Sequence, residues 1–224
     1  MAEFLYETHM HTSEVSACAA NSAKEQIKYY KIMGYTGVIV TDHFVNGNNG
    51  CDRNLSWNEK MHFMASGYEN AKIAGDELGV DVFFGWEFSI RGSDFLTYGL
   101  DLDFLLKHPG IDRMGIEKYS ATVRKHGGYI AQAHPFREAF YIEKCYPVSA
   151  HLLDGIEVFN AMDSKTANAK ALSFAEEYNL PKQSGSDSHS IGNYIYGGIK
   201  LRERAQSFND IINAIKSRNI ELIM

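Results

Sequence analysis

Two histidines near the start of the chain, His9 and His11, are separated by one residue and follow a short apolar run. Side chains on an extended backbone alternate between two faces, so these two imidazoles point to the same side. Two imidazoles on one side can bind one ion, because neutral imidazole is a common ligand of zinc, iron and manganese. Pairs of this kind also arise by chance, so the interpretation depends on whether further ligands reach the same place.

Further histidines and carboxylates stand where other β-like runs end. They are His43, Glu87, His134, Asp187 and His189. In barrels and doubly wound sheets, the carboxyl ends of the strands form the binding site, so we expect these side chains to meet. Asp94 is the exception, because it precedes its apolar run and must reach the site another way.

The elements that must position these side chains alternate between strand and helix patterns. Predicted strands cover 4–8, 37–41, 80–84, 94–100, 128–133, 155–159, 182–186 and 198–201, and predicted helices cover 22–33, 58–78, 113–126, 164–178 and the segment around 208–215. This alternation favours parallel strands with helical crossovers. It amounts to about seven or eight βα units, typical of a small barrel. We therefore expect one α/β domain spanning residues 1–224.

Composition narrows the function classes. The 224 residues are 45% hydrophobic and 22% charged, as in ordinary globular proteins. A net charge of −6 argues against a broad nucleic-acid or anionic-membrane surface. Cys18, Cys51 and Cys145 are too scattered for a disulfide framework. With no signal-like start and no apolar run long enough to span a bilayer, we expect a cytoplasmic protein with no membrane partner.

Taken together, the motifs resemble the polymerase and histidinol phosphatase (PHP) superfamily of metal-dependent phosphoesterases. The matching segments are His9-Met10-His11, Thr41-Asp42-His43, Gly85-Trp86-Glu87, Ala133-His134-Pro135-Phe136 and Ser186-Asp187-Ser188-His189. They occur in the family's order through nearly the whole chain. The resemblance implies a distorted, TIM-like (β/α)7 barrel that holds two or three divalent ions, which would be zinc, manganese or iron.

The resemblance also implies a ligand set. A first ion would be held by His9, His11, Glu87 and Asp187. Glu87 would bridge to a second ion held by His134 and Asp94, where the family often has histidine, and this harder ligand shifts the preference towards manganese or iron. A third ion would be held by His43 and His189, with Glu14 or Ser16 as the further ligand. Glu14 is favoured, and an ordinary loop carboxylate is its equal alternative. Cys18 lies near this loop and is interpreted as a small buried residue rather than a thiolate ligand.

The expected chemistry follows from such ions. Paired divalent ions can generate a hydroxide nucleophile and clamp the oxygens of a phosphate, with Glu87, Asp187 and His189 at the reacting centre. Arg137 is the leading candidate for binding the phosphate and Arg91 the second, each with a surface role as the alternative. The motifs of serine hydrolases, P-loop enzymes and zincins are absent from the sequence.

The favoured function is hydrolysis of a small phosphomonoester, such as histidinol phosphate or a nucleotide, by a metal-activated hydroxide. The alternatives are a metal-dependent amidohydrolase, an exonuclease on short oligonucleotides and a non-catalytic PHP module. Loops 44–57 and 135–151 are expected to shape the choice of substrate, and the sequence leaves the oligomeric state open. Asp42 is expected to orient a ligand histidine or to cap a loop, and Glu157 to be a structural carboxylate.

Overall fold

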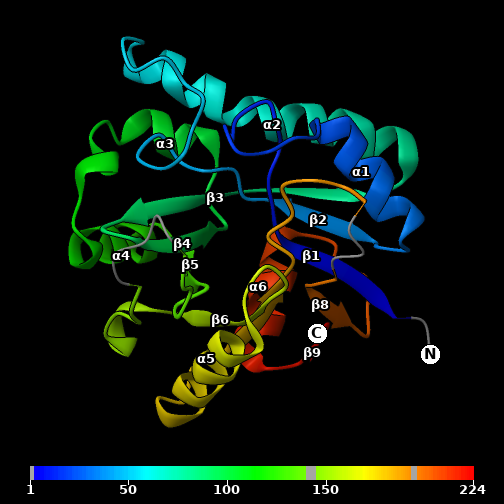
Figure 1. Ribbon diagram of the computed structural model, residues 1–224. Helices are drawn as coiled ribbons and strands as arrows, with labels where there is room; N and C mark the ends of the chain where they lie inside the picture. Colours follow the sequence, from blue (N-terminus) through cyan, green and yellow to red (C-terminus); the bar gives the residue numbers. More distant parts are fainter. Residues whose placement is uncertain (1–2, 140–144, 193–195) are drawn as a thin grey trace.

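The computed structural model describes residues 3–139, 145–192 and 196–224. Its elements are, in chain order, β1 (Phe4–Met10), α1 (Ala23–Ile32), β2 (Gly37–Val40), α2 (Trp57–Leu78), β3 (Asp81–Ile90), β4 (Ser93–Tyr98), α3 (Leu102–Lys107), α4 (Ile116–Lys125), β5 (Tyr129–Ala133), β6 (Gly155–Asn160), α5 (Lys165–Glu177), β7 (Lys182–Gly185), β8 (Ile199–Leu201), α6 (Phe208–Ser217) and β9 (Glu221–Leu222). Short 3₁₀ helices lie at Ile111–Arg113 and Ala150–Leu152. Figure 1 shows α1 and α2 together over one side of the strands and α5 on the other side.

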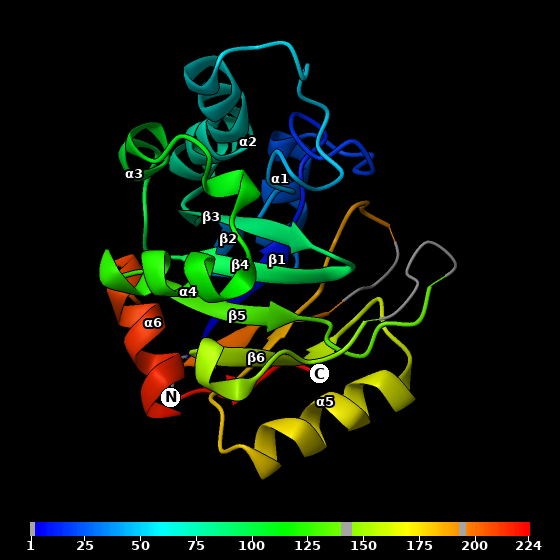
Figure 2. The ribbon, with the colours of Figure 1, turned by 90° about the vertical axis from the view of Figure 1, so that its left-hand side faces the viewer.

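All of these strands belong to one sheet, in the order β7-β6-β5-β4-β3-β2-β1-β8-β9. The neighbours β1, β2 and β3 pair in parallel, as do β5, β6 and β7. A parallel bridge between Met10 and Ser188 brings the segment after β7 back to β1. The sheet is therefore a nearly closed, barrel-like layer, and Figure 2 shows α5 running alongside β6 at its lower side.

The expectation of parallel strands throughout is wrong. β4 runs antiparallel to both β3 and β5, because the two residues between β3 and β4 allow only a hairpin. β8 and β9 are antiparallel as well. The α/β barrel class is right, but seven regular βα units are not confirmed in a sheet of nine strands.

Local sequence signals account for where the helices begin. Ser22 and Glu25 form a capping box at the start of α1, and Ser56 with Glu59 forms a second one at α2. Both helices then pack their apolar faces against the outward side of β2, where Val38 lies in the same core cluster. The next residue, Ile39, faces the other way and joins β1, β4, β5 and α6 in a second cluster. The short helix α3 and the strand β9 were not expected from the sequence.

The apolar core fills one end of the barrel and leaves the polar site at the other end. Buried side chains of β1, β2, β4 and β5 pack against Ile211, Ile212 and Ile215 of α6, the stripe expected from their spacing. Apolar packing therefore occupies the end of the barrel where α6 lies. Within the described ranges, no helix is both long and apolar enough to cross a bilayer.

Candidate metal centre

The histidine pair at the end of β1 is buried and points inward. The pairing register of β1 with β2 shifts between Glu7 and Met10, which marks an irregularity just before His11. His9 and His11 are both fully buried, and their Nε2 atoms lie 3.1 Å apart. The prediction that these imidazoles share one side is confirmed.

Two carboxylates converge on this pair. The His9 Nε2 atom lies 3.4 Å from Glu87 Oε1 and 3.4 Å from Asp187 Oδ1. The His11 Nε2 atom lies 3.5 Å from Glu87 Oε2 and 3.2 Å from Asp187 Oδ1. The structure thus brings together all four residues expected around the first ion, although Glu87 lies inside β3 rather than at its end.

The protonation of the two rings makes this cluster fit a cation. His9 Nδ1 lies 3.0 Å from Glu157 Oε1 and donates its proton to that carboxylate. The Ser16 hydroxyl donates to Asp42 Oδ1 and so can only accept from His11 Nδ1, at 3.0 Å. In the neutral rings, both Nε2 lone pairs therefore face each other. Such an arrangement is stable only with a positive charge between the two nitrogens, which a metal ion or a proton supplies. Burial lowers the pKa of His9, but Asp187, Glu157 and Glu87 outweigh burial and raise that pKa well above its usual value, so a proton takes this place when no ion is bound.

The spacing of the ligand atoms fits as well. Around an ion bound at ~2.0–2.3 Å, neighbouring ligand atoms lie ~3–3.7 Å apart. The contacts of His9 and His11 with each other, Glu87 and Asp187, at 3.1–3.5 Å, lie in this range. His43 Nδ1 and Glu87 Oε2 are 2.7 Å apart, yet both atoms are buried without a hydrogen bond in the described structure. Buried polar atoms of this kind fit a site that holds a cation.

A second group shares Glu87. His134 Nε2 lies 3.0 Å from Glu87 Oε1 and 3.9 Å from Asp94 Oδ2. Because β4 is antiparallel, its first residues lie beside the carboxyl ends of β3 and β5, and Asp94 pairs with Ala133 in the sheet. This is how a residue at the start of a strand reaches the site.

The third group consists of His11, His43 and His189, whose ligand nitrogens lie within 4.8 Å of one another. The rings of His11 and His189 are stacked with centroids 4.0 Å apart. Cys18 is exposed, so the expectation of a small buried residue is wrong. Its side chain contacts the rings of His43 and His189. Burial raises the pKa of this thiol, but the contacts with His189 and His43 outweigh burial and lower the pKa to about 6.

Two of the expected site residues lie elsewhere. The Glu14 carboxylate accepts the Ala23 backbone N–H at the start of α1 and lies near Asn70, so it serves as a helix cap. Arg91 is exposed in the hairpin turn between β3 and β4, with a φ of 50°. We therefore carry neither residue into the site.

The Arg137 guanidinium lies beside the cluster and forms hydrogen bonds with three side chains. Its Nη2 donates to Asp187 Oδ2 at 2.7 Å and to Asn160 at 2.9 Å, while its Nε donates to Asp163 at 2.7 Å. Arg137 thus lies beside the expected first ion and also orients one of its ligands. Asn160, at the end of β6, forms hydrogen bonds with Arg137 and Glu157.

Glu157 has a larger part than the sequence suggested. Besides His9, it accepts the backbone N–H of His134 and the Asn160 side chain on Oε2. Gly185 of β7 lies so close that an added Cβ would be 2.4 Å from Glu157 and 2.5 Å from His9. Asp42 caps Thr12 and acts on His11 through Ser16. The contact of Glu157 with His9 has no local signal in the sequence, since the two residues lie 148 positions apart.

The backbone is also unusual where two ligands leave their strands. His134 and Asp187 have φ values of 27° and 54°, a region that residues other than glycine seldom adopt. Such conformations cost about 1–3 kcal/mol each and cluster at functional sites. The Asp187 N–H donates to the His9 carbonyl, which fixes its turn against β1.

Neighbouring charges shift the pKa values of three buried side chains of the cluster, Glu87, Asp187 and His11. Burial alone would raise the pKa of Glu87, but His43 and His9 hold that pKa well below its usual value. Asp187 behaves alike, because His9 and Arg137 outweigh its burial and lower the pKa. Burial and the neighbouring His189 and His43 lower the pKa of His11, which favours its neutral, ligand form.

A cavity of about 720 Å³ opens onto the cluster. It is lined by Asp187, His189, Arg137, Cys18 and neighbouring polar residues. Its lining includes Asn48 of the loop 44–57 and the start of the loop 135–151, whose residues 140–144 lie outside the described ranges. This cavity is therefore the candidate substrate site.

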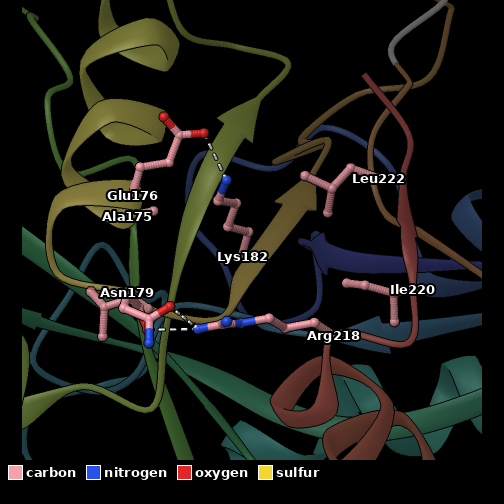
Figure 3. Close-up of a pocket in the computed structure, with 8 residues that line it drawn as sticks. Ala175, Glu176, Asn179, Lys182, Arg218, Ile220 and Leu222 are labelled. Atoms are coloured by element: carbon pink, nitrogen blue, oxygen red, sulfur yellow. Dashed lines mark hydrogen bonds and ion pairs between the residues drawn. The ribbon is translucent and has the colours of Figure 1, made fainter.

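A second cavity of about 400 Å³ lies between α5, β7 and the segment after α6 (Figure 3). Its basic groups are paired, Lys182 with Glu176 and Arg218 with Asn179. It lies near the start of β7, away from the histidine and carboxylate cluster. We therefore assign it no part in the chemistry.

Comparison with known proteins agrees with this geometry. Residues 165–220 match the family described as PHP-associated. A two-domain protein of Bacteroides vulgatus, containing a predicted PHP-like metal-dependent phosphoesterase, has the same fold over 99% of the chain, with a TM-score of 0.72 and 14% identity. The family match covers the C-terminal quarter of the chain, and the structural match shows that the two proteins share a fold. The present chain covers 64% of that protein, less than two thirds of its length.

Two further structures share this fold. PsfC from Pseudomonas syringae matches 95% of the chain and 88% of its own length, with a TM-score of 0.68 and 19% identity. A putative metal-dependent phosphoesterase from Bifidobacterium adolescentis matches 96% of each chain, with a TM-score of 0.60 and 15% identity. A search of curated protein sequences finds no match.

Proposed function

We propose that this chain is a metal-dependent phosphoesterase that hydrolyses a small phosphomonoester, such as histidinol phosphate or a nucleotide. One observation supports this most directly. Two imidazole lone pairs and two carboxylates are oriented at a single point by Glu157 and Ser16, and an arginine lies at the edge of that point. We further propose that residues 1–224 form one such domain.

His9, His11, Glu87 and Asp187 would hold one divalent ion, and His134 and Asp94 would hold a second with Glu87 between them. Zinc, manganese and iron all suit these nitrogen and oxygen ligands. When bound, such ions supply Lewis acidity to a phosphoryl oxygen and lower the pKa of a water molecule. His43 and His189 offer a place for a third ion.

The protein's own groups would bind and orient the substrate. Arg137 faces the cavity and would exchange part of its contact with Asp187 for the phosphate oxygens, which a guanidinium binds in pairs. Asp163 holds the guanidinium in place through Nε. Glu87, Asp187 and His189 are the side chains that we assign to the reacting centre.

The amidohydrolase alternative keeps some support. A structure named as an amidohydrolase from Chromobacterium violaceum shares the fold over 96% of the chain, with a TM-score of 0.60 and 15% identity. An arginine joined to a metal ligand favours the phosphate ester, because amide hydrolysis presents no dianion for it to bind.

The test is phosphate release by the purified chain loaded in turn with manganese, zinc or ferrous iron. An aryl phosphate and a panel of phosphorylated metabolites are assayed for released phosphate. Cyclic amides are assayed for ring opening, and short oligonucleotides for released nucleotides. We expect phosphate release that is lost in Asp187→Asn, and a KM about 10- to 100-fold higher in Arg137→Ala, as for a lost hydrogen bond to a charged group. Glu117→Gln on the outer surface of α4 is the control. Absence of phosphate release with every metal, in protein shown to bind ions, would refute the proposal.

A further inference from the structure

The outer histidine group lacks an obvious acidic ligand. His189 lines the cavity, and the ring of His43 lies beside it with centroids 5.6 Å apart. The ring of His11 contacts both of these rings. His11 Nε2 is directed at Glu87 and Asp187, and so belongs to the first group. An ion at His43 and His189 therefore needs at least one further ligand from this chain or from solvent.

Glu14 does not supply that ligand. Both of its carboxylate oxygens lie 2.9–3.1 Å from the Ala23 nitrogen at the start of α1. The Glu14 side chain thus completes the N-terminal hydrogen bonds of a helix, which is where a carboxylate is most favourable. Moving it to the histidines would leave that N–H without its partner.

Cys18 lies in a loop that backbone hydrogen bonds fix beside His43 and His189. The Ala17 N–H donates to the Asn48 carbonyl at 3.0 Å, and the Ala20 N–H donates to the His189 carbonyl at 2.7 Å. These two bonds attach the loop to the segments that carry His43 and His189. The Cys18 side chain contacts both imidazoles and lines the cavity together with Asp187.

We propose that Cys18 binds the outer ion as a thiolate, together with His43 and His189, and so completes a third metal position with one sulfur and two nitrogen ligands. This inference rests on the metal centre of the proposed function. A thiolate is a soft ligand, so this position would select zinc or ferrous iron over manganese, while the oxygen-rich position at Asp94 accepts the harder ion. The chain would then hold two chemically different kinds of ion side by side.

The experiment uses the full chain, stripped with a chelator and titrated with cobalt(II), and follows absorption rather than turnover. A cobalt–thiolate bond gives a near-ultraviolet charge-transfer band that nitrogen and oxygen ligands do not give. We expect this band in the parent protein and in Cys51→Ser, and its loss in Cys18→Ser. We also expect the affinity for the outer ion to fall at least about 10- to 100-fold in Cys18→Ser, the loss seen even for supporting residues.

Cys145→Ser is the second control, because Cys145 lies next to the His134 carbonyl on the other side of the centre. A band lost in Cys145→Ser and kept in Cys18→Ser would overturn the proposal. A second measurement tests the same metal–sulfur bond without any mutation. Zinc added to the metal-free parent protein should slow alkylation of Cys18 by iodoacetamide, followed by peptide mass, and an unchanged rate would contradict a zinc–sulfur bond.

The two proposals fail in different ways. If Cys18 is no ligand, the cobalt band is missing while the other ions bind and phosphate is still released. If the chain is no phosphoesterase, no phosphate is released while the band and the alkylation protection remain.

Discussion

At the scale of single residues, supporting groups decide whether the ligands can bind a cation. Glu157 and the Asp42–Ser16 pair keep a proton on Nδ1 of His9 and of His11, and this leaves both Nε2 atoms as lone-pair donors. Metal-binding histidines commonly donate their other N–H to a carboxylate or carbonyl in this way. Glu157 is therefore a positioning residue rather than a structural carboxylate alone.

Glu157→Gln should weaken metal binding. Glutamine must turn its NH₂ group either to His9 Nδ1 or to the donors at His134 and Asn160, and each choice places two donors face to face. We expect the affinity for the first ion to fall about 10- to 100-fold. Zinc titration of the metal-free protein measures this.

Glu69→Gln, on the exposed face of α2, is the matched control and should bind zinc as the parent does. Unchanged zinc affinity in Glu157→Gln, with the fold intact by circular dichroism, would show that the His9 tautomer is set by other groups.

At the scale of elements, packing and capping compete with the site for side chains. Glu14→Ala removes the acceptor of the Ala23 N–H, so we expect the free energy of unfolding to fall by about 0.5–2 kcal/mol. The metal content should stay that of the parent protein. Urea denaturation and elemental analysis give the two readouts, and loss of one ion per chain would return Glu14 to the ligand set.

Gly67 of α2 shows how closely a helix approaches the supporting network. A Cβ at this position would lie 2.3 Å from Asp42 Oδ2 and 2.4 Å from Thr12 Oγ1. Three hydrogen bonds from Thr12 and Ser16 hold the Asp42 carboxylate in place, so it cannot easily move away. A side chain at position 67 would therefore overlap the hydrogen-bonded Asp42 carboxylate.

Gly67→Ala should destabilise the fold, although alanine in a helix interior is otherwise favoured over glycine by about 1 kcal/mol. We expect a lower midpoint of urea unfolding and weaker zinc binding, because Asp42 acts on His11 through Ser16. Glu69→Ala, two residues further along α2, changes only the helix propensity of an exposed position. It should leave the midpoint of urea unfolding and the zinc affinity unchanged. A midpoint above that of the parent would mean that the network yields at little cost.

At the scale of the whole molecule, the candidate ligands come from strands that are far apart in the sequence. An ion bound by them would therefore link distant segments of the barrel. Segments from residue 9 to residue 189 meet within one group of contacts. An ion bound by the folded state alone stabilises it by RT ln(1 + [L]/Kd), about 2.7 kcal/mol at a hundredfold excess over Kd.

Removal of metal by a chelator should therefore lower the melting temperature, and added zinc should restore it. Differential scanning calorimetry checks this, with Asp187→Asn as a variant whose melting temperature should respond less to zinc. A melting temperature that is the same with and without ions would contradict a cation within the buried cluster.

The sequence alone determined the residue types at the strand ends, most helix starts and the α/β class. These depend on interactions between near neighbours, such as the continuous apolar run of β2 and the Ser22–Glu25 capping box, and near neighbours are visible in the order of residues. The pairing of His9 with His11 is likewise a property of one extended segment.

Only the tertiary structure decided which groups complete the site. The reversal of β4 brings Asp94 to the cluster, the cap at Ala23 withdraws Glu14, and Glu157 finds His9 across 148 positions of sequence. In the unfolded chain a carboxylate can pair with many different donors. In the folded chain it pairs with a particular buried donor, because leaving that donor unpaired would cost free energy. That selection acts between distant segments, so no local pattern records it.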